Sequence, residues 1–240
     1  MIEENYAEDG KFKSVIKAFG ISEDALNSRL DEISDALKTV EIIAERNVLD
    51  LKIVIESDNF IDFGKAVKMF SESFPENIYA DFDGTLQEVL VSMLKIGKFK
   101  ISVAESFTGG NLASRIISVP GASEVFYEGI VAYSSEAKIR RLGVEEESIK
   151  KNKPVSSQVA GEMASGLLSE GVPDLVVSTT GLAGPSSDES GFPVGLCYLA
   201  AGSRQGVSVY RYMFDGTRAE ITEKGVQTAL FLAIKSVKHL

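Results

Sequence analysis

The chain has 240 residues, of which 44% are apolar and 25% are charged, and its formal net charge is −10. One cysteine and one histidine, His239 near the C-terminus, exclude an intrachain disulfide, a Cys/His metal site and Ser-His-Asp catalysis. An acidic chain without a long apolar run or a secretory leader predicts a cytoplasmic protein with neither nucleic-acid nor membrane partners.

The excess negative charge lies in the first part of the chain. Residues 1–97 contain 20 acidic and 10 basic side chains, whereas residues 98–240 contain 15 of each. This change in composition predicts two domains with a boundary near Gly97.

The first part alternates helical and strand-like patterns. Ser22 is a candidate N-cap for the second helix, because a serine there precedes a run of apolar residues at helical spacing. We expect helices over 11–19, 23–37, 61–73 and 85–97, and strands at VEIIAE, LKIVIES and IYA. This pattern predicts a small α+β domain.

The second part alternates strands and helices more regularly. We expect strands at KISVAES, EVFYEGIVAYS, DLVVSTTG, GLCYLAAGS and GVSVYRYMF, and helices at TGGNLASRIISV, SEAKIRRLG, SSQVAGEMASGLLSEG and the C-terminal segment from Thr217. Alternation of this kind predicts an α/β layer sandwich. Cys197 lies in one of the buried strands and is expected to be a core residue.

The stretch ADFDGTL, residues 80–86, looks like the first motif of the haloacid dehalogenase family, with Asp81 as its nucleophile. That chemistry needs a buried strand before the aspartate and a later acidic cluster for magnesium. The preceding apolar run is only IYA, and no adjacent pair of aspartates follows. A turn that caps the next helix explains the same residues and is favoured.

A more promising site begins at VAESFTGGNLASRI, residues 103–116. Ser106 lies where a strand turns into a helix, and Gly109 and Gly110 open that helix. Free backbone N–H groups at such a turn can hold a phosphate or a developing oxyanion. The alternative is a plain helix cap with glycines in a tight turn.

A second glycine loop, residues 179–195, follows another buried strand, and loops at the ends of such strands tend to share one crevice. A serine nucleophile without histidine needs another base. Lysine can act as one if burial lowers its pKa, and Lys138 follows an apolar strand. Tyr133, five residues earlier, is a further candidate catalytic residue that could orient Lys138 or relay a proton. The alternative is an exposed helix lysine.

Several separated motifs of residues 98–240 resemble the CinA C-terminal domain family, the nicotinamide-nucleotide amidases. They are AESFTGG, VPGAS, EGIVAYSSEAK, PVSSQVA, TGLAGP, FPVG and FDGTR. The resemblance implies a three-layer α/β/α amidase domain over 98–240. Residues 1–97 resemble the small KH-like α+β module that precedes this domain in CinA proteins. The module has no GxxG loop for RNA. The first domain of full-length CinA proteins does not occur in this sequence.

The resemblance implies deamidation of nicotinamide mononucleotide to nicotinic acid mononucleotide and ammonia. Ser106 matches the nucleophile, Lys138 the general base and Tyr133 a residue of the same pocket. No metal or cofactor is implied, and the family's amidases are often dimers. Backbone N–H groups near Thr108–Gly110 are expected to stabilise the oxyanion, and Arg218 and the amides of the 181–184 loop to hold the phosphate. The residues expected to bind the pyridine nucleotide are Thr108, Gly109, Gly110, Thr180, Gly181, Ala183, Gly184 and Arg218.

The sequence departs from the family pattern at several positions near these residues. Phe107 replaces a cysteine, Ser135 an asparagine, Phe192 a lysine and Thr217 an aspartate, and residues 186–189 are more acidic than the family's loop. Two alternatives to the amidase therefore stay open. One is a non-catalytic nucleotide-binding or scaffold protein on the same fold, and the other is the phosphatase that uses Asp81.

Overall fold

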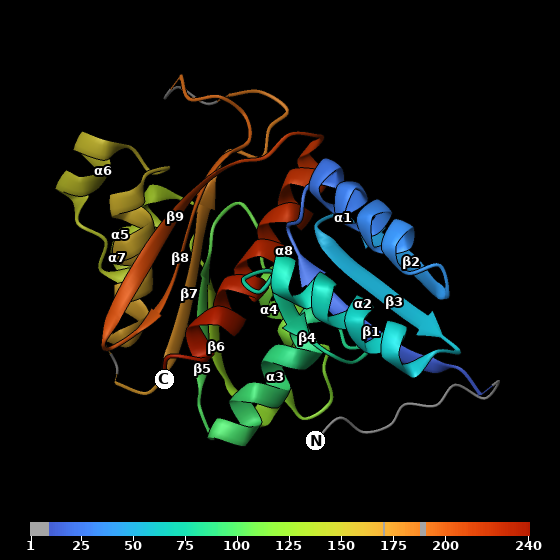
Figure 1. Ribbon diagram of the computed structural model, residues 1–240. Helices are drawn as coiled ribbons and strands as arrows, with labels where there is room; N and C mark the ends of the chain where they lie inside the picture. The colour runs from blue at the N-terminus through green and yellow to red at the C-terminus, as the bar shows by residue number, and fades with distance from the viewer. Residues whose placement is uncertain (1–9, 170, 188–190) are drawn as a thin grey trace. The chain divides into compact units, whose positions relative to one another are not determined.

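The computed structural model describes residues 10–169, 171–187 and 191–240 (Figure 1). The chain forms two compact units, Met1–Thr85 and Leu86–Leu240. The charge distribution predicted a boundary near Gly97, at the end of helix α3 (Leu86–Gly97). The boundary in the structure lies before this helix. The reason is packing, because the buried apolar side of α3 lies against helices α4 (Asn111–Ile117) and α8 (Arg218–Val237).

The first unit is an α+β domain with one antiparallel sheet. Its elements in chain order are β1 (Phe12–Phe19), α1 (Glu23–Ala36), β2 (Val40–Asn47), β3 (Asp50–Ser57), α2 (Phe60–Ser73) and β4 (Ile78–Ala80). The strand order is β2-β3-β1-β4, and every pair is antiparallel. This βαββαβ order is that of the ferredoxin-like split βαβ motif.

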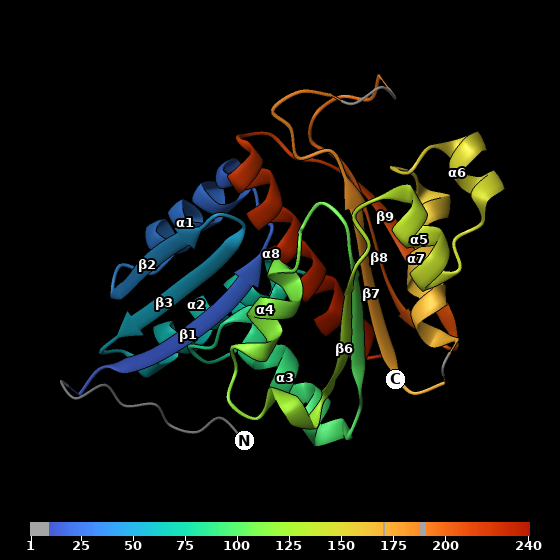
Figure 2. The ribbon, with the colours of Figure 1, turned by 180° about the vertical axis from the view of Figure 1, so that it is seen from behind.

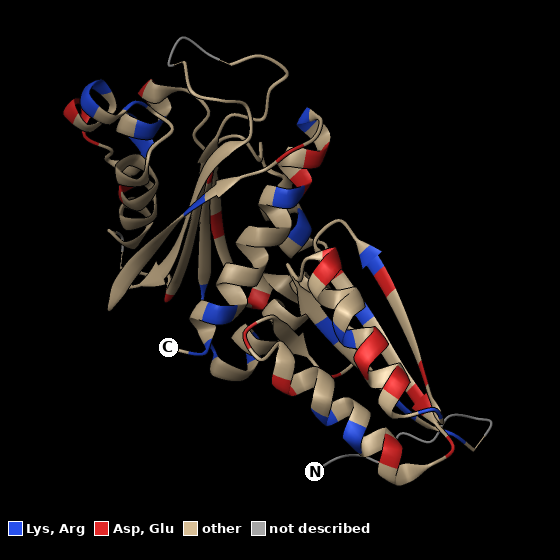
Figure 3. Cartoon of the chain, turned by 45° about the horizontal axis from the view of Figure 1, so that its top comes forward, with Lys and Arg blue, Asp and Glu red and all other residues tan. Residues whose placement is uncertain are grey.

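Helices α1 and α2 pack on the sheet and enclose its apolar core, which includes Ile33, Ile53 and Phe70. Ser22 caps α1 as predicted, since its Oγ accepts a hydrogen bond from the Ala25 N–H. The exposed side of α1 carries acidic side chains, which contribute to the excess negative charge of this unit (Figure 3).

The prediction of a helix over 11–19 is wrong, because these residues form strand β1. Phe12, Val15, Ile16 and Phe19 have the i, i+3, i+4, i+7 spacing of a helix face. In the structure β1 instead pairs with β3 along its whole length. Tertiary pairing therefore overrides the helical spacing.

The second unit is a three-layer α/β/α domain around a mixed five-stranded sheet. Its strand order is β6-β5-β7-β8-β9. Strand β5 is parallel to β6 and to β7, whereas β8 is antiparallel to both of its neighbours, β7 and β9. The strands are β5 (Ile101–Glu105), β6 (Phe126–Val131), β7 (Leu175–Gly181), β8 (Leu196–Ser203) and β9 (Gly206–Met213).

Helices cover both faces of this sheet, as Figure 1 and Figure 2 show from opposite sides. α4 and α8 lie on one face, and α7 (Ser157–Leu168) lies on the other with α5 (Ser135–Leu142) beside it. A short helix that the sequence did not predict, α6 (Glu146–Asn152), contacts α7. Thr217 caps α8 through a capping box with Glu220, as its position had indicated.

Candidate functional site

Ser106 is the first residue after the central strand β5. All five residues of β5 are buried, and the strand is hydrogen-bonded between β6 and β7. The Ser106 side chain is nearly buried, and its backbone N–H donates to the Thr179 carbonyl at 3.0 Å. The serine is therefore held at the carboxyl ends of the parallel strands, where open α/β sheets bind ligands.

Lys138 is on the inner side of α5 and is 1% exposed, so it is not the exposed helix lysine of the alternative interpretation. Its Nζ lies 2.9 Å from Ser106 Oγ. The same amine donates to the carbonyls of Ala132, at 2.8 Å, and Tyr133, at 3.3 Å. The structure therefore brings the predicted nucleophile and the predicted base into direct hydrogen-bond contact.

Burial lowers the pKa of the Lys138 amine from 10.5 to about 8. The physical cause is desolvation, which disfavours the ammonium form. At pH 7.5 a group with a pKa of 8 is neutral in about a quarter of the molecules, against about one in a thousand at a pKa of 10.5. Lys138 is thus poised to accept a proton near neutral pH.

The turn after Ser106 uses both of its glycines in left-handed conformations. Gly109 has φ of +61° and Gly110 of +96°. The Gly109 N–H donates to the Ser106 carbonyl at 3.1 Å, and the Gly110 N–H donates to Glu105 Oε2 at 3.0 Å. These two amides are therefore engaged within the turn, which corrects their expected use as oxyanion donors. Within the described residues, the N–H groups of Phe107 and Thr108 have no hydrogen-bond partner.

Two threonines expected at the site use their side chains within the fold. Thr108 Oγ1 lies 2.7 Å from Thr179 Oγ1, and both residues are buried behind the Ser106 turn. Thr180 Oγ1 donates to the Pro154 carbonyl at 2.9 Å and is also buried. Their side chains support the turn and the end of β7.

The small residues of the glycine loop after β7 are required for different structural reasons. A Cβ at Gly181 would lie 2.5 Å from Cys197 Sγ, so this glycine permits β7 and β8 to pack. Gly184 has φ of +83°, and Ala183 is buried. Cys197 is a core residue, as predicted, and burial raises the pKa of its thiol to about 12.

Arg218, the first residue of α8, connects two of the predicted segments. Its Nη1 donates to the Gly184 carbonyl at 2.6 Å, and its Nη2 donates to the Tyr133 hydroxyl at 2.9 Å. The Tyr133 side chain is largely exposed, whereas its backbone carbonyl accepts from Lys138. Tyr133 therefore links the Lys138 environment to Arg218 and the glycine loop.

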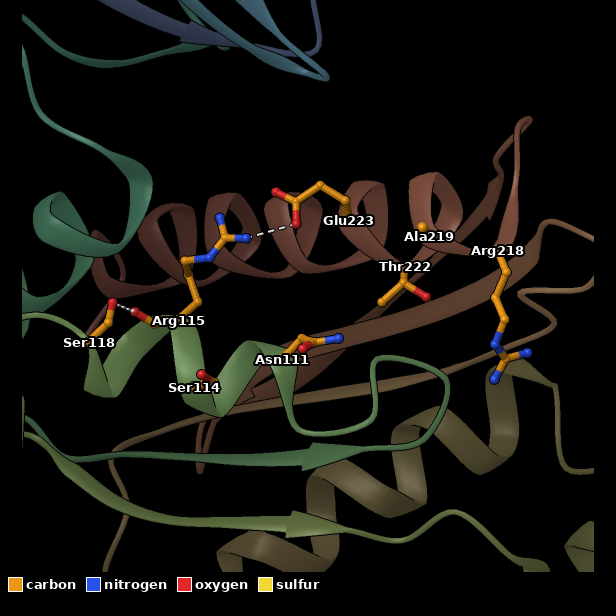
Figure 4. A pocket seen from close by; sticks show the side chains of 8 residues that line it. All are labelled: Asn111, Ser114, Arg115, Ser118, Arg218, Ala219, Thr222 and Glu223. Carbon is orange, nitrogen blue, oxygen red and sulfur yellow. Dashed lines mark hydrogen bonds and ion pairs between the residues drawn. The ribbon is translucent and has the colours of Figure 1, made fainter.

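A groove of about 620 Å³ runs between α4 and α8 (Figure 4). Arg218 lies at one end, and Arg115, paired with Glu223 at 2.8 Å, lies toward the other. Its lining residues are Asn111, Ser114, Arg115, Ser118, Arg218, Ala219, Thr222 and Glu223. Ser106 and Lys138 do not line it, so Arg218 is the residue that this groove shares with the predicted site.

Phe107 does not fill the site, although it replaces the family's cysteine beside the nucleophile. Its side chain is buried and packs against α8 at Gly225. A Cβ at Gly225 would lie 2.5 Å from Phe107 Cζ, so the glycine makes room for the ring.

The structure does not support Asp81 as a nucleophile. Asp81 is exposed and follows β4, a three-residue strand at the edge of an antiparallel sheet. Asp83 forms an ion pair with Lys52 at 2.5 Å. In the described part of the chain, no group of three or more His, Cys, Asp and Glu side chains is placed to hold a metal ion.

Fold and site together define an α/β/α domain with a buried serine–lysine pair at the carboxyl edge of its sheet. Residues 83–237 match the family model described as the CinA C-terminal domain. The chain therefore belongs to the CinA C-terminal domain family, as its motifs had indicated.

Curated relatives agree with this assignment. A CinA-like protein of Kosmotoga olearia is 35% identical over 226 residues, which cover 91% of this chain and 55% of that protein. A CinA-like protein of Endomicrobium trichonymphae is 34% identical over 239 residues, covering 95% of this chain and 56% of that protein. The chain thus spans little more than half the length of the curated relatives it matches.

Solved structures of related proteins have a fold similar to about two thirds of this chain. A CinA superfamily protein of Klebsiella pneumoniae is 28% identical with a TM-score of 0.62, covering 65% of this chain and 97% of that chain. A competence/damage-inducible protein of Agrobacterium tumefaciens is 35% identical with a TM-score of 0.58, covering 63% and 94%. Among the described residues, no helix is both long enough and apolar enough to cross a membrane.

Proposed function

We propose that the second unit is an amide hydrolase that converts nicotinamide mononucleotide to nicotinic acid mononucleotide and ammonia. The observation that carries the proposal is the 2.9 Å contact between Lys138 Nζ and Ser106 Oγ, made by an amine that is 1% exposed. A nucleophile needs a base within hydrogen-bond reach, and this pair meets that requirement without histidine.

In the acylation half of the reaction, neutral Lys138 accepts the Ser106 proton while Oγ attacks the carboxamide carbon. A tetrahedral intermediate with a negative oxygen forms. Lys138 then donates its proton to the departing nitrogen, the C–N bond breaks and ammonia leaves. Ser106 is left as an ester of the nicotinic acid moiety.

In the deacylation half, Lys138, neutral again, accepts a proton from water while the water oxygen attacks the ester carbon. The bond to Ser106 Oγ breaks, and Lys138 returns the proton to Oγ. The carboxylic acid product ionises on release. One water is consumed and one ammonia is formed in each cycle.

The oxyanion needs donors that are not already engaged. The N–H groups of Phe107 and Thr108 meet this condition, whereas those of Gly109 and Gly110 do not. Loss of one such donor commonly costs about 10²–10³-fold in turnover. The Arg218 guanidinium is hydrogen-bonded to Gly184 and Tyr133 of the predicted site, and we assign it to the substrate phosphate.

The test is to mix the purified protein with nicotinamide mononucleotide and to follow ammonia. The proposal requires release by the wild-type protein, and loss of that release in Ser106→Ala and in Lys138→Ala. Binding of the nucleotide without ammonia release would contradict hydrolysis and favour a nucleotide-binding scaffold. Phosphate release that depends on magnesium and on Asp81 would favour the phosphatase.

A further inference from the structure

Glu105, the last residue of β5, is a fully buried carboxylate that the proposed mechanism does not use. Its Oε2 accepts from the N–H groups of Gly110 and Leu112, each at 3.0 Å, and its Oε1 accepts from Ala113 at 2.8 Å. Burying a carboxylate is costly unless hydrogen bonds compensate. Three backbone amides compensate here.

These three amides belong to the N-cap and first turn of helix α4, where N–H groups have no acceptor within the helix, and the remaining one, that of Asn111, donates to the Thr108 carbonyl at 3.0 Å. The N-cap residue of α4 is Gly110, whose left-handed conformation comes with no side-chain cap. A helix start of this kind normally takes its acceptor from the N-cap residue itself. Here the acceptor is the carboxylate of Glu105, which precedes the Ser106 turn in the chain. Glu105 therefore connects the start of this turn to the helix that follows it.

We call the three hydrogen bonds from Gly110, Leu112 and Ala113 to the Glu105 carboxylate the clamp. The clamp fixes the conformation of the turn that contains Ser106. Ser106, Phe107, Thr108 and Gly109 lie between Glu105 and the amides that it binds. The two uncommitted amides, those of Phe107 and Thr108, belong to this clamped segment. Their direction relative to Ser106 Oγ thus depends on the carboxylate.

The backbone of Glu105 also connects to the base. Its carbonyl accepts from the Ala132 N–H at 2.8 Å, and the Ala132 carbonyl accepts from Lys138 Nζ at 2.8 Å. One residue thus sets the start of the nucleophile turn and the position of one of the groups that hold the base.

We infer that Glu105 is a positioning residue of the Ser106–Lys138 site, which acts by clamping the nucleophile turn through its carboxylate. The inference rests on the proposed function. Glu105 is placed to fix geometry and takes no part in proton transfer. Its loss should therefore affect the chemical step far more than substrate binding.

The test compares two substitutions that fail in different ways. Glu105→Gln keeps the side-chain length but turns one acceptor into an N–H donor that faces backbone N–H groups. Glu105→Asp keeps the charge but withdraws the carboxylate from the amides. Asn59→Ala is the matched control, because Asn59 caps α2 by accepting from two amides in the first unit.

Turnover of nicotinamide mononucleotide and amide hydrogen exchange are measured for each folded variant. A displacement of about 1 Å at a reacting group costs about 10²-fold. Both Glu105 variants should therefore lose about 10²-fold in kcat with KM changed less than threefold. Exchange at Gly110, Leu112 and Ala113 should accelerate at least tenfold. Asn59→Ala should keep kcat, although it loses a helix cap of the same kind.

Three results would overturn the inference. One is a kcat within threefold of the wild-type value in both variants while the wild-type protein is active, which leaves the proposed function standing. Another is unchanged exchange at the three amides. The third is absence of turnover by the wild-type protein itself, which removes the proposed function as well. If Glu105→Gln does not fold, Glu105→Asp decides the outcome.

Discussion

Lys138 Nζ lies 2.9 Å from Ser106 Oγ, although the two residues belong to different layers of the second unit. Ser106 ends the central strand, and Lys138 comes from a helix on one face of the sheet. The amine is buried and donates to Ser106 Oγ and two carbonyls, and among the described residues it has no carboxylate partner. A structural lysine is usually paired or exposed, and this arrangement instead favours the neutral amine.

Burial of Lys138 predicts a pH-dependent stability. Its pKa is about 8 in the folded chain and 10.5 as the reference value. Between these two pH values the unfolded chain binds more protons, so the free energy of unfolding should rise with pH by about 3 kcal/mol from this group. Urea unfolding of the wild-type protein and Lys138→Met between pH 7 and 10.5 checks this. The difference between the two curves should change by that amount, and a constant difference would contradict the burial argument.

Contact between Phe107 and Gly225 predicts a strong coupling energy. In a helix, Gly→Ala normally gains up to about 1 kcal/mol. Gly225→Ala should instead destabilise the second unit by about 1–3 kcal/mol, because the new methyl group overlaps the Phe107 ring. In a Phe107→Ala background the same change should be stabilising. Denaturant unfolding of the four proteins gives the cycle, and additive effects would show that the ring does not pack there.

The capping box of α8 explains how the chain tolerates threonine in place of the family's aspartate. Thr217 Oγ1 accepts from the Glu220 N–H, and Glu220 accepts from the Thr217 N–H in return. Thr217→Ala should cost about 1 kcal/mol in unfolding free energy, whereas Thr217→Ser should be nearly neutral because it keeps the acceptor at the N-cap and the hydroxyl that donates to Glu220 Oε2 at 2.8 Å. Equal losses in both variants would argue that the cap does not contribute.

The bond between Tyr133 and Arg218 predicts an effect on substrate binding. Tyr133→Phe removes the acceptor for Arg218 Nη2 and leaves the backbone contact to Lys138 in place. A hydrogen bond to a charged group contributes about 1.5–3 kcal/mol. KM for nicotinamide mononucleotide should therefore rise about tenfold with little change in kcat. Tyr210→Phe, on β9, is the control. A fall in kcat alone would mean that Tyr133 takes part in the chemistry.

Much of the fold follows from local patterns. Buried strands, glycine loops and caps such as Ser22 and Thr217 are set by nearby residues, and they were predicted from the sequence. The β1 segment has the apolar spacing of a helix face, and only its pairing with β3, which the sequence pattern does not reveal, makes it a strand. The domain boundary was misplaced because α3 packs by tertiary contacts that composition does not reveal.

The site shows the same division. Ser106 and Lys138 could be predicted because a chain whose one histidine, His239, lies near the C-terminus needs another base, and because the motifs contain both residues. Glu105 was missed because an acidic residue at a strand end is usually exposed, and its role depends on amides five to eight positions later. The assignment of Gly109 and Gly110 to the oxyanion failed for a related reason, since hydrogen-bond commitments within the turn are not visible in a spacing.

The most direct test of the central claim is the pH dependence of kcat/KM for ammonia release from nicotinamide mononucleotide. If neutral Lys138 activates Ser106, kcat/KM should rise about tenfold per pH unit below pH 8 and level off above it, following a pKa of about 8. Lys138→Met should abolish the activity. A profile that is flat or falling between pH 6 and 9, or activity that survives in Lys138→Met, would contradict it.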